Sequence, residues 1–345
     1  MFLLSDSKYL QHMHNAHNHV FYTDGIMPCS GHLTWMRDMC RRPTLFLNIN
    51  LKIIDEIHLI GDKLLDEYPH IEQVLFDHTG DPIYNRNLGD NLNTWIKNKG
   101  VRGILASSEW TKKQHSDLIE VLYLNMIVQR KDLEQTFNLS NKKYLYSCLN
   151  RNPRWHRALF YTILKQRNLL DNMIYTFHPY DPYHNRRIYS YTNKEDFGKY
   201  YKETIENMQD FPIVWPGDIP GANDLTTVHD AYSIAECNIV TETEVELEFT
   251  SEKIWKPIAS GQCFHIVGSL GTNTWLRSLG FETFDNGYDT ITDIITRLEH
   301  VADHLSTESM LTNINIEKIK HNQNHLSSGI VEKHILDRLV TVLDQ

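Results

Sequence analysis

The sequence predicts an α/β protein of two domains with a cleft between them. Short β-rich runs alternate with amphipathic helical stretches along the whole chain, which is typical of α/β domains with mainly parallel sheets. The 345 residues are too many for one ordinary core and too few for three. With 41% hydrophobic and 23% charged residues, the composition is that of a folded globular protein.

The first domain is expected to cover residues 1–135. Its apolar, β-rich runs predict strands at 19–22, 44–47, 73–76 and 103–106. Apolar residues at helical spacing predict a helix over 51–67 and another over 110–128. The polar stretch 130–143 then separates this set of elements from the next, and we place the domain boundary within it.

The second domain is expected to cover residues 136–315, followed by a C-terminal helical segment over 316–345. Strands are predicted at 144–149, 173–177, 213–215, 237–241 and 263–267. Helices are predicted after Pro153, after Ser251, after Thr272, over 289–305 and over 329–343.

Charge and cysteine content exclude several classes of protein. The net charge of −10 disfavours non-specific binding to nucleic acid or anionic membranes. Five cysteines without a Cys-x-x-Cys pair fit neither a disulfide framework nor a zinc site, and indicate buried thiols in a reducing compartment. The N-terminus has no basic region before its short apolar start, and no apolar run approaches the roughly 20 residues that span a bilayer. We therefore expect a cytoplasmic protein without a membrane span, in a bacterium or, if phage-encoded, in the host cytoplasm.

The densest motif, Ser-Glu-Lys-Ile-Trp-Lys-Pro, begins at Ser251. Either Ser251 or Thr250 is placed to cap a helix, with Glu252 in its first turn. Lys253 and Lys256 oppose the helix dipole there, which favours a bound anion. A nucleoside diphosphate suits this pattern, with the carboxylate on the ribose and the ammonium groups on the phosphates. The alternative is a surface helix with ordinary charges.

A second cluster of cations follows the strand predicted at 144–149. Asn152 as N-cap and Pro153 as the first helical residue would start a helix. Arg151, Arg154 and Arg157 then gather at its electropositive end. Because guanidinium groups match phosphate oxygens in geometry, a diphosphate is the favoured partner, and a solvated basic face is the alternative.

Glu242 stands out from a run of alternating glutamates, Val-Thr-Glu-Thr-Glu-Val-Glu-Leu-Glu. An exposed strand edge explains most of that run. Glu242, however, comes directly after an apolar strand, and strand carboxyl ends face the ligand crevice in open α/β sheets.

The first half offers candidates for a general base. Asp77, His78 and Asp81 follow the strand predicted at 73–76, and a base that takes a proton from a hydroxyl must be one of these residue types. Asp77 is the first choice and the other two compete with it. A turn built from Asp, Gly and Pro explains the same residues structurally.

No metal site is predicted. Four N-terminal histidines lack the helical i, i+4 pairing and any nearby cysteine, so a polar loop is their expected state: His12, His14, His17 and His19. An Asp-x-Asp motif for Mg²⁺ is also missing after the predicted strands.

Several segments together resemble a group of bacterial and phage glycosyltransferases. They are YLYSCLNRNPRWHRALFYTIL, NIVTETE, FTSEKIWKPIASGQCFHIVGSLGTNTWLRSLGFETF and NGYD, within about residues 144–300. That group is similar to the donor-binding half of the fucosyltransferases, through the Glu-Lys helix start, the Arg helix and a Gly-Phe-x-Thr-Phe strand. The resemblance implies that Glu252 and Lys253 hold ribose and phosphates, and that Glu242 matches a family glutamate. It also implies that one arginine joins the diphosphate: Arg151, Arg154 or Arg157.

The resemblance further implies a GT-B fold, in which two Rossmann-like domains face a cleft. Residues 1–135 would then bind the acceptor and 136–315 the nucleotide sugar. Transfer would be inverting and metal-independent, with Arg and Lys in place of Mg²⁺ and a base from the first domain. The nucleotide-diphosphate sugar would be a co-substrate, the acceptor a glycan or other hydroxylated molecule, and no other cofactor is expected.

Two alternatives remain open at the level of sequence. A phage enzyme could glycosylate a hydroxymethylated DNA base, so that nucleic acid is the acceptor. Such an enzyme needs a basic face, toward which four arginines could contribute: Arg37, Arg41, Arg42 and Arg102. The other alternative is a non-catalytic module that binds sugar nucleotides.

Overall fold

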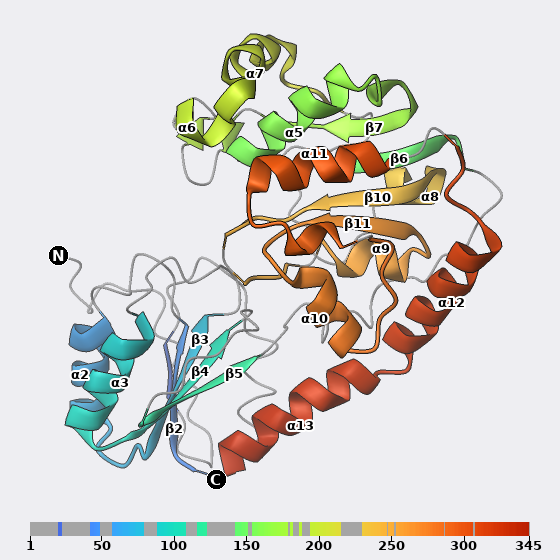
Figure 1. Ribbon diagram of the computed structural model, residues 1–345. Helices are drawn as coiled ribbons and strands as arrows, with labels where there is room; N and C mark the ends of the chain where they lie inside the picture. Colours follow the sequence, from blue (N-terminus) through green and yellow to red (C-terminus); the bar gives the residue numbers. More distant parts are fainter. Residues whose placement is uncertain are drawn as a thin grey trace. The chain divides into compact units, whose positions relative to one another are not determined.

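The fold is α/β, as predicted, and divides into two compact units. The computed structural model describes residues 20–22, 42–48, 57–78, 88–107, 116–122, 142–150, 154–178, 180–181, 186–187, 194–214, 230–246, 248–251, 253–285, 287–305 and 308–344. The first unit comprises residues 1–128 together with 332–345, and the second comprises residues 129–331. Each unit is built around a sheet of parallel strands (Figure 1).

The first unit has a five-stranded parallel sheet whose strand order follows the chain, β1-β2-β3-β4-β5. The strands are β1 (Val20–Tyr22), β2 (Thr44–Asn48), β3 (Gln73–His78), β4 (Arg102–Ser107) and β5 (Leu118–Leu122). The central residues of β2, β3 and β4 are short apolar runs that are buried, as parallel strands require.

Two helices, α2 (Ile57–Glu67) and α3 (Leu88–Lys99), lie side by side against this sheet (Figure 1). The buried residues of α3 recur at helical spacing and form its apolar face: Leu88, Leu92, Trp95 and Ile96. The indole N–H of Trp95 donates to Asp62 Oδ1 of α2 at 2.7 Å, and Lys99 pairs with the same carboxylate at 2.9 Å. The two helices are therefore joined by apolar packing and by one shared carboxylate.

Gly61 allows this close contact, and we expect Gly61→Ala to destabilise the first unit. A Cβ at Gly61 would lie 2.5 Å from Cζ2 of the Trp95 ring. Overpacking of this kind costs about 1–3 kcal/mol, and alanine recovers only about 1 kcal/mol of helix propensity. The ring cannot move aside without losing its bond to Asp62. Urea unfolding followed by tryptophan fluorescence should show a lowered midpoint.

Leu59→Ala is the matched control on the same helix. Leu59 is 73% exposed, so its truncation is expected to change the free energy of unfolding by less than about 0.5 kcal/mol. A midpoint for Gly61→Ala that equals or exceeds that of the unchanged protein would contradict the packing argument.

The helix predicted over 110–128 is wrong for residues 118–122, which form strand β5. The run Leu-Ile-Glu-Val-Leu is short, apolar and partly β-branched, and hydrophobic periodicity alone does not distinguish a buried strand from a helical turn. Helix α3 was not predicted, although its apolar spacing is helical. The strands predicted at 44–47, 73–76 and 103–106 are confirmed, and the structure extends each by one or two residues.

The second unit has a four-stranded parallel sheet in the order β11-β10-β6-β7. Its strands are β6 (Tyr144–Leu149), β7 (Met173–Thr176), β10 (Ala235–Thr241) and β11 (Cys263–Val267). The chain passes from β6 to β7 on one side, then returns to the other side of β6 to form β10 and β11. The direction of strand order thus reverses between β6 and β10. Such a reversal is a topological switch point, where open α/β sheets bind ligands at the strands' carboxyl ends.

Helices cover both faces of this sheet (Figure 1). On one face lie α5 (Trp155–Gln166) and α11 (Ile294–His304), and on the other lie α9 (Trp255–Ala259) and α12 (Asn313–Ser327). Further helices in the described part of this unit are α6 (Lys194–Phe197), α7 (Tyr201–Asn207), α8 (Asp230–Ile234) and α10 (Thr272–Ser278). Short 3₁₀ turns lie at Leu170–Asn172, Gly198–Tyr200, Met208–Asp210 and Tyr288–Thr290, and β8 (Tyr180–Asp181) pairs with β9 (Arg186–Arg187).

The last helix, α13 (Ile330–Asp344), confirms the helix predicted over 329–343. From Glu332 onward it belongs to the first unit. Its buried apolar residues are Val331, Ile335, Leu339, Val342 and Leu343. Arg102 of β4 donates a hydrogen bond to the carbonyl oxygen of Val342 and another to Gln73 Oε1 at 3.2 Å. A return of the chain end to the first unit was not anticipated from the sequence.

Three further predictions for the second unit need correction. The strand predicted at 213–215 is, within the described residues, a single antiparallel bridge between Ile213 and Phe177. The helix predicted over 289–305 begins only at Ile294, where Asp293 caps it by accepting from the N–H of Thr296. Residues 280–284, expected as a Gly-Phe-x-Thr-Phe strand, contain no strand: Gly280 lies in a turn and residues 281–284 are irregular.

Candidate functional site

The candidate site lies at the carboxyl ends of β6 and β10, on either side of the switch point. Thr241, the last residue of β10, donates its hydroxyl to Asn150 Oδ1, directly after β6. The N–H of Asn150 is held by the hydroxyl of Thr176 at 2.9 Å at the end of β7. All three side chains are buried. This row of hydrogen bonds fixes the ends of three strands relative to each other, and neither Asn150 nor Thr241 was singled out from the sequence.

Glu242 is the central residue of the site, and its side chain is fully buried. Carboxylate Oε1 accepts from the N–H of Ser251 at 3.1 Å. Oε2 accepts from the hydroxyl of Ser251 at 2.6 Å and from the N–H of Thr243 at 3.2 Å. The carboxylate therefore holds the segment that carries the Ser-Glu-Lys motif against the end of β10.

The helix expected to start at Ser251 starts later. Helix α9 begins at Trp255 with Ile254 as its N-cap, so neither Ser251 nor Thr250 caps it. The N–H and hydroxyl of Ser251 are instead directed to Glu242, which leaves residues 253–254 as a turn. The helix ends at Ala259, and Gly261 follows it with a left-handed φ of 65°.

Arg157 and His156 support Glu242 from the first turn of α5. The guanidinium of Arg157 donates to the carbonyl oxygens of Thr241 at 2.9 Å and Glu242 at 3.2 Å. Nε2 of His156 lies 3.0 Å from the carbonyl oxygen of Glu242. A carbonyl oxygen only accepts, so Nε2 of His156 carries the proton. Both side chains are 2% exposed, and their contacts orient the backbone of Glu242.

Burial sets the protonation of these two residues. Burial lowers the pKa of Arg157 to about 10, the nearby charge of Arg154 lowers it too, and Glu242 opposes the shift. Arg157 remains a cation near neutral pH. Burial and then the charge of Arg157 hold the pKa of His156 well below its usual value, so its ring is neutral. Glu242 and Arg157 therefore place opposite charges in the same buried region.

Arg154 lies at the N-cap of α5, where Asn152 was expected. The helix begins at Trp155, two residues later than a cap at Asn152 would give. An Nη1 atom of Arg154 lies 3.5 Å from Oε1 of Glu244, and the two side chains are 16% and 18% exposed. The pair joins the segment after β6 to the segment after β10.

Lys253 completes the group of cations. Its Nζ lies 3.1 Å from Oγ of Ser251 and 3.5 Å from Oγ1 of Thr243. Because Ser251 also binds Glu242, hydrogen bonds run from Arg157 through Glu242 and Ser251 to Lys253. Lys256 lies in the first turn of α9 and is half-buried.

The structure thus brings Arg154, Arg157, Glu242 and Lys253 together at one edge of the sheet. Arg151 and Glu252 lie outside the described residues, as does Asp81 of the first unit. Asp77 and His78 are the last two residues of β3, where their backbones pair with Ala106 and Ser107. The four N-terminal histidines discussed above also lie outside the described residues.

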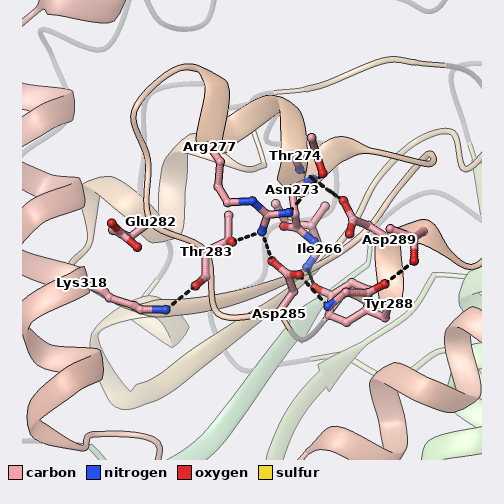
Figure 2. Close-up of polar contacts among 12 residues, drawn as sticks. Ile266, Asn273, Thr274, Arg277, Glu282, Thr283, Asp285, Tyr288, Asp289 and Lys318 are labelled. Carbon is pink, nitrogen blue, oxygen red and sulfur yellow. Dashed lines mark hydrogen bonds and ion pairs between the residues drawn. The ribbon is translucent and has the colours of Figure 1, made fainter.

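A second polar network surrounds the start of α10 (Figure 2). Asp289 Oδ2 accepts from the N–H groups of Asn273 at 3.0 Å and Thr274 at 3.3 Å. Arg277 pairs with Asp285 at 2.8 Å and donates to Thr283 at 2.5 Å. These bonds hold the irregular residues 281–285 and the 3₁₀ turn at Tyr288–Thr290 against α10. The Gly-Phe-x-Thr-Phe and Asn-Gly-Tyr-Asp motifs were both noted in the sequence for the resemblance to glycosyltransferases, but their hydrogen bonding around the start of α10 was not predicted.

No protein-family model matches this sequence, and no curated protein matches it significantly. Among the described residues, no group of three or more His, Cys, Asp or Glu side chains could hold a metal ion. No helix in the described part of the chain has the length and apolarity needed to cross a membrane.

Proposed function

We propose that this chain is a glycosyltransferase that transfers a sugar from a nucleotide-diphosphate donor to an acceptor hydroxyl. The observation that supports it best is the position of the cations. Arg154 and Lys253 come from segments on opposite sides of the switch point of the second sheet, beside the buried pair of Arg157 and Glu242. Cations at this edge of an open α/β sheet suit a diphosphate.

In this proposal some residues of the site contact the donor and others hold those residues in position. Arg154 and Lys253 are partly exposed, and they contact the phosphates. Arg157, Glu242 and Ser251 are buried and hold those cations in position. Glu252, by the resemblance to fucosyltransferases, contacts the ribose, and Lys256 adds positive charge nearby.

The reaction follows from that arrangement. The acceptor oxygen attacks the anomeric carbon while the bond between that carbon and the phosphate oxygen breaks. The nucleoside diphosphate leaves with the bonding electron pair, and Arg and Lys stabilise its added negative charge without a divalent ion. A base of the first unit, with Asp77 first and His78 and Asp81 as competitors, takes the acceptor's proton. The two units are then the acceptor and donor domains of the GT-B architecture, and attack opposite the leaving group inverts the anomeric centre.

Thermal-shift measurements with UDP, GDP, CDP and ADP and their sugars test the donor site. A bound donor raises stability by about RT ln(1 + [L]/Kd), so one nucleotide series is expected to raise the melting temperature at millimolar concentration. Lys253→Ala is expected to abolish that shift and to leave the ligand-free melting temperature nearly unchanged, because Lys253 is partly exposed. The shift should persist in EDTA.

Lys320→Ala is a control for the loss of one positive charge, since Lys320 is an exposed residue of α12. Its shift should equal that of the unchanged protein. If no nucleotide diphosphate or nucleotide sugar stabilises the protein, the proposed function is wrong. Binding without consumption of any sugar nucleotide, over a panel of hydroxylated acceptors, would instead identify a non-catalytic binding module.

A further inference from the structure

Glu244 occupies a distinctive place among the acidic residues that follow β10. The carboxylate of Glu242 is fully buried and accepts three hydrogen bonds from its own segment. Glu246 and Glu248 are exposed. Glu244 forms an ion pair with a cation of the site: its Oε1 lies 3.5 Å from Nη1 of Arg154.

The ion pair is largely withdrawn from solvent. The side chains of Arg154 and Glu244 are 16% and 18% exposed, so water screens their attraction less than it screens a surface pair. A carboxylate and a phosphate present similar anionic oxygens to a guanidinium. The carboxylate of Glu244 therefore competes with any phosphate that approaches the same side of Arg154.

We propose that Glu244 is an internal counter-ion that Arg154 exchanges for the donor's diphosphate. This inference rests on the proposed function. With the site empty, Glu244 neutralises Arg154 and keeps it in place at the N-cap of α5. When a diphosphate binds, its oxygens take the place of the carboxylate, and when the nucleoside diphosphate product leaves, Glu244 pairs with Arg154 again. The exchange weakens diphosphate binding and speeds product release.

The inference predicts that removing the charge of Glu244 tightens binding. Glu244→Gln keeps the side-chain size but removes the competing anion, so the Kd of inorganic pyrophosphate is expected to fall by about 3- to 10-fold. Any nucleoside diphosphate that binds the unchanged protein should show the same gain. If the enzyme is active, product inhibition by that nucleotide should strengthen by a similar factor.

Calorimetric titration with pyrophosphate, UDP, GDP, CDP and ADP tests the exchange. The proteins are the unchanged chain, Glu244→Gln, Glu244→Ala, Arg154→Gln and the double variant Arg154→Gln/Glu244→Gln, with melting temperatures confirming that each is folded. Glu246→Gln is the matched control for loss of one negative charge nearby, and its affinity should be unchanged. The gain from Glu244→Gln should vanish in the Arg154→Gln background, since the competition acts through Arg154.

The titrations distinguish failure of the counter-ion role of Glu244 from failure of the proposed function. Unchanged affinity in both Glu244 variants, with binding by the unchanged chain, overturns the counter-ion role and leaves the proposed function standing. Weaker binding in both also overturns it, because Glu244 would then contact the ligand favourably. A gain that persists without Arg154 overturns it too, since a general field effect would explain the result. Failure of all five ligands to bind the unchanged chain overturns the proposed function and this inference together.

Discussion

Replacing Glu242 with alanine is expected to lower the free energy of unfolding of the second unit by about 3–5 kcal/mol. The substitution leaves the guanidinium of Arg157 buried without the opposite charge beside it. It also removes the acceptors for the N–H groups of Ser251 and Thr243 and for the hydroxyl of Ser251. Buried polar groups that lose their partners add to the cost. Urea unfolding at pH 7 measures the change.

One variant at Glu242 separates charge from packing, and one at an exposed neighbouring glutamate serves as a control. Glu242→Gln keeps the volume and one acceptor oxygen, so a smaller loss is expected than for alanine. Glu246→Ala, on the same segment but exposed, should change the free energy of unfolding by less than about 0.5 kcal/mol. A loss below 1 kcal/mol for Glu242→Ala would show that Glu242 is not the residue that organises the site.

The strands of both sheets were largely predictable because their signal is local. The runs at 144–149, 237–241 and 263–267 are apolar segments of strand length next to polar residues, and the structure forms strands at each. The error at β5 has a local cause as well, since its five residues, four of them apolar, fit a strand and a helical turn equally. The order of the strands has no such local signal. That β10 returns to the far side of β6 depends on pairing between residues about 90 positions apart.

Most of the charged residues of the site could be predicted from the sequence, but the hydrogen bonds that organise them could not. Glu242, Lys253 and the arginines were singled out as charged residues at predicted strand ends or helix starts, and the structure brings the described ones together. The hydrogen bonds that organise them join segments that are apart in the sequence, such as the bond from Ser251 to Glu242. For that reason the local capping rules named Ser251 as a candidate N-cap, although its hydroxyl binds Glu242 and Ile254 is the N-cap of α9. His156 was overlooked because a neutral, buried histidine next to arginines has no distinguishing local pattern.

The fold should lose stability in mild acid through His265 of β11. This side chain is 2% exposed, and neither ring nitrogen has a hydrogen-bond partner in the described part of the chain. Burial, together with the nearby His304, lowers the pKa of His265 to about 4, against a small opposing effect of Asp285. Below about pH 6.5 this histidine binds a proton in the unfolded chain, whereas in the folded chain it stays neutral until the pH approaches 4. Stability from this group is therefore full above about pH 6.5 and is lost as pH falls toward 4.

The expected size of the effect is about 2 kcal/mol between pH 7 and pH 5. His265→Leu removes the titrating group and the two unpartnered nitrogens, and it nearly preserves the volume. We therefore expect the variant to be as stable as the unchanged protein at pH 7, or more stable. At pH 5 the variant should be more stable by about a further 2 kcal/mol. Urea unfolding at the two pH values measures the difference. Equal pH dependence in both proteins would show that another group accounts for any acid lability.

His156 provides the contrast that separates titration from hydrogen bonding. It too is buried and neutral, so a leucine there should also reduce the loss of stability in acid. Nε2 of His156, however, donates to the carbonyl oxygen of Glu242, whereas the ring nitrogens of His265 have no hydrogen-bond partner among the described residues. His156→Leu should therefore cost about 1 kcal/mol or more at pH 7, where His265→Leu costs nothing. Two buried histidines whose pKa is lowered in the same direction are thus expected to respond differently to one substitution, because only one of them supports the candidate site.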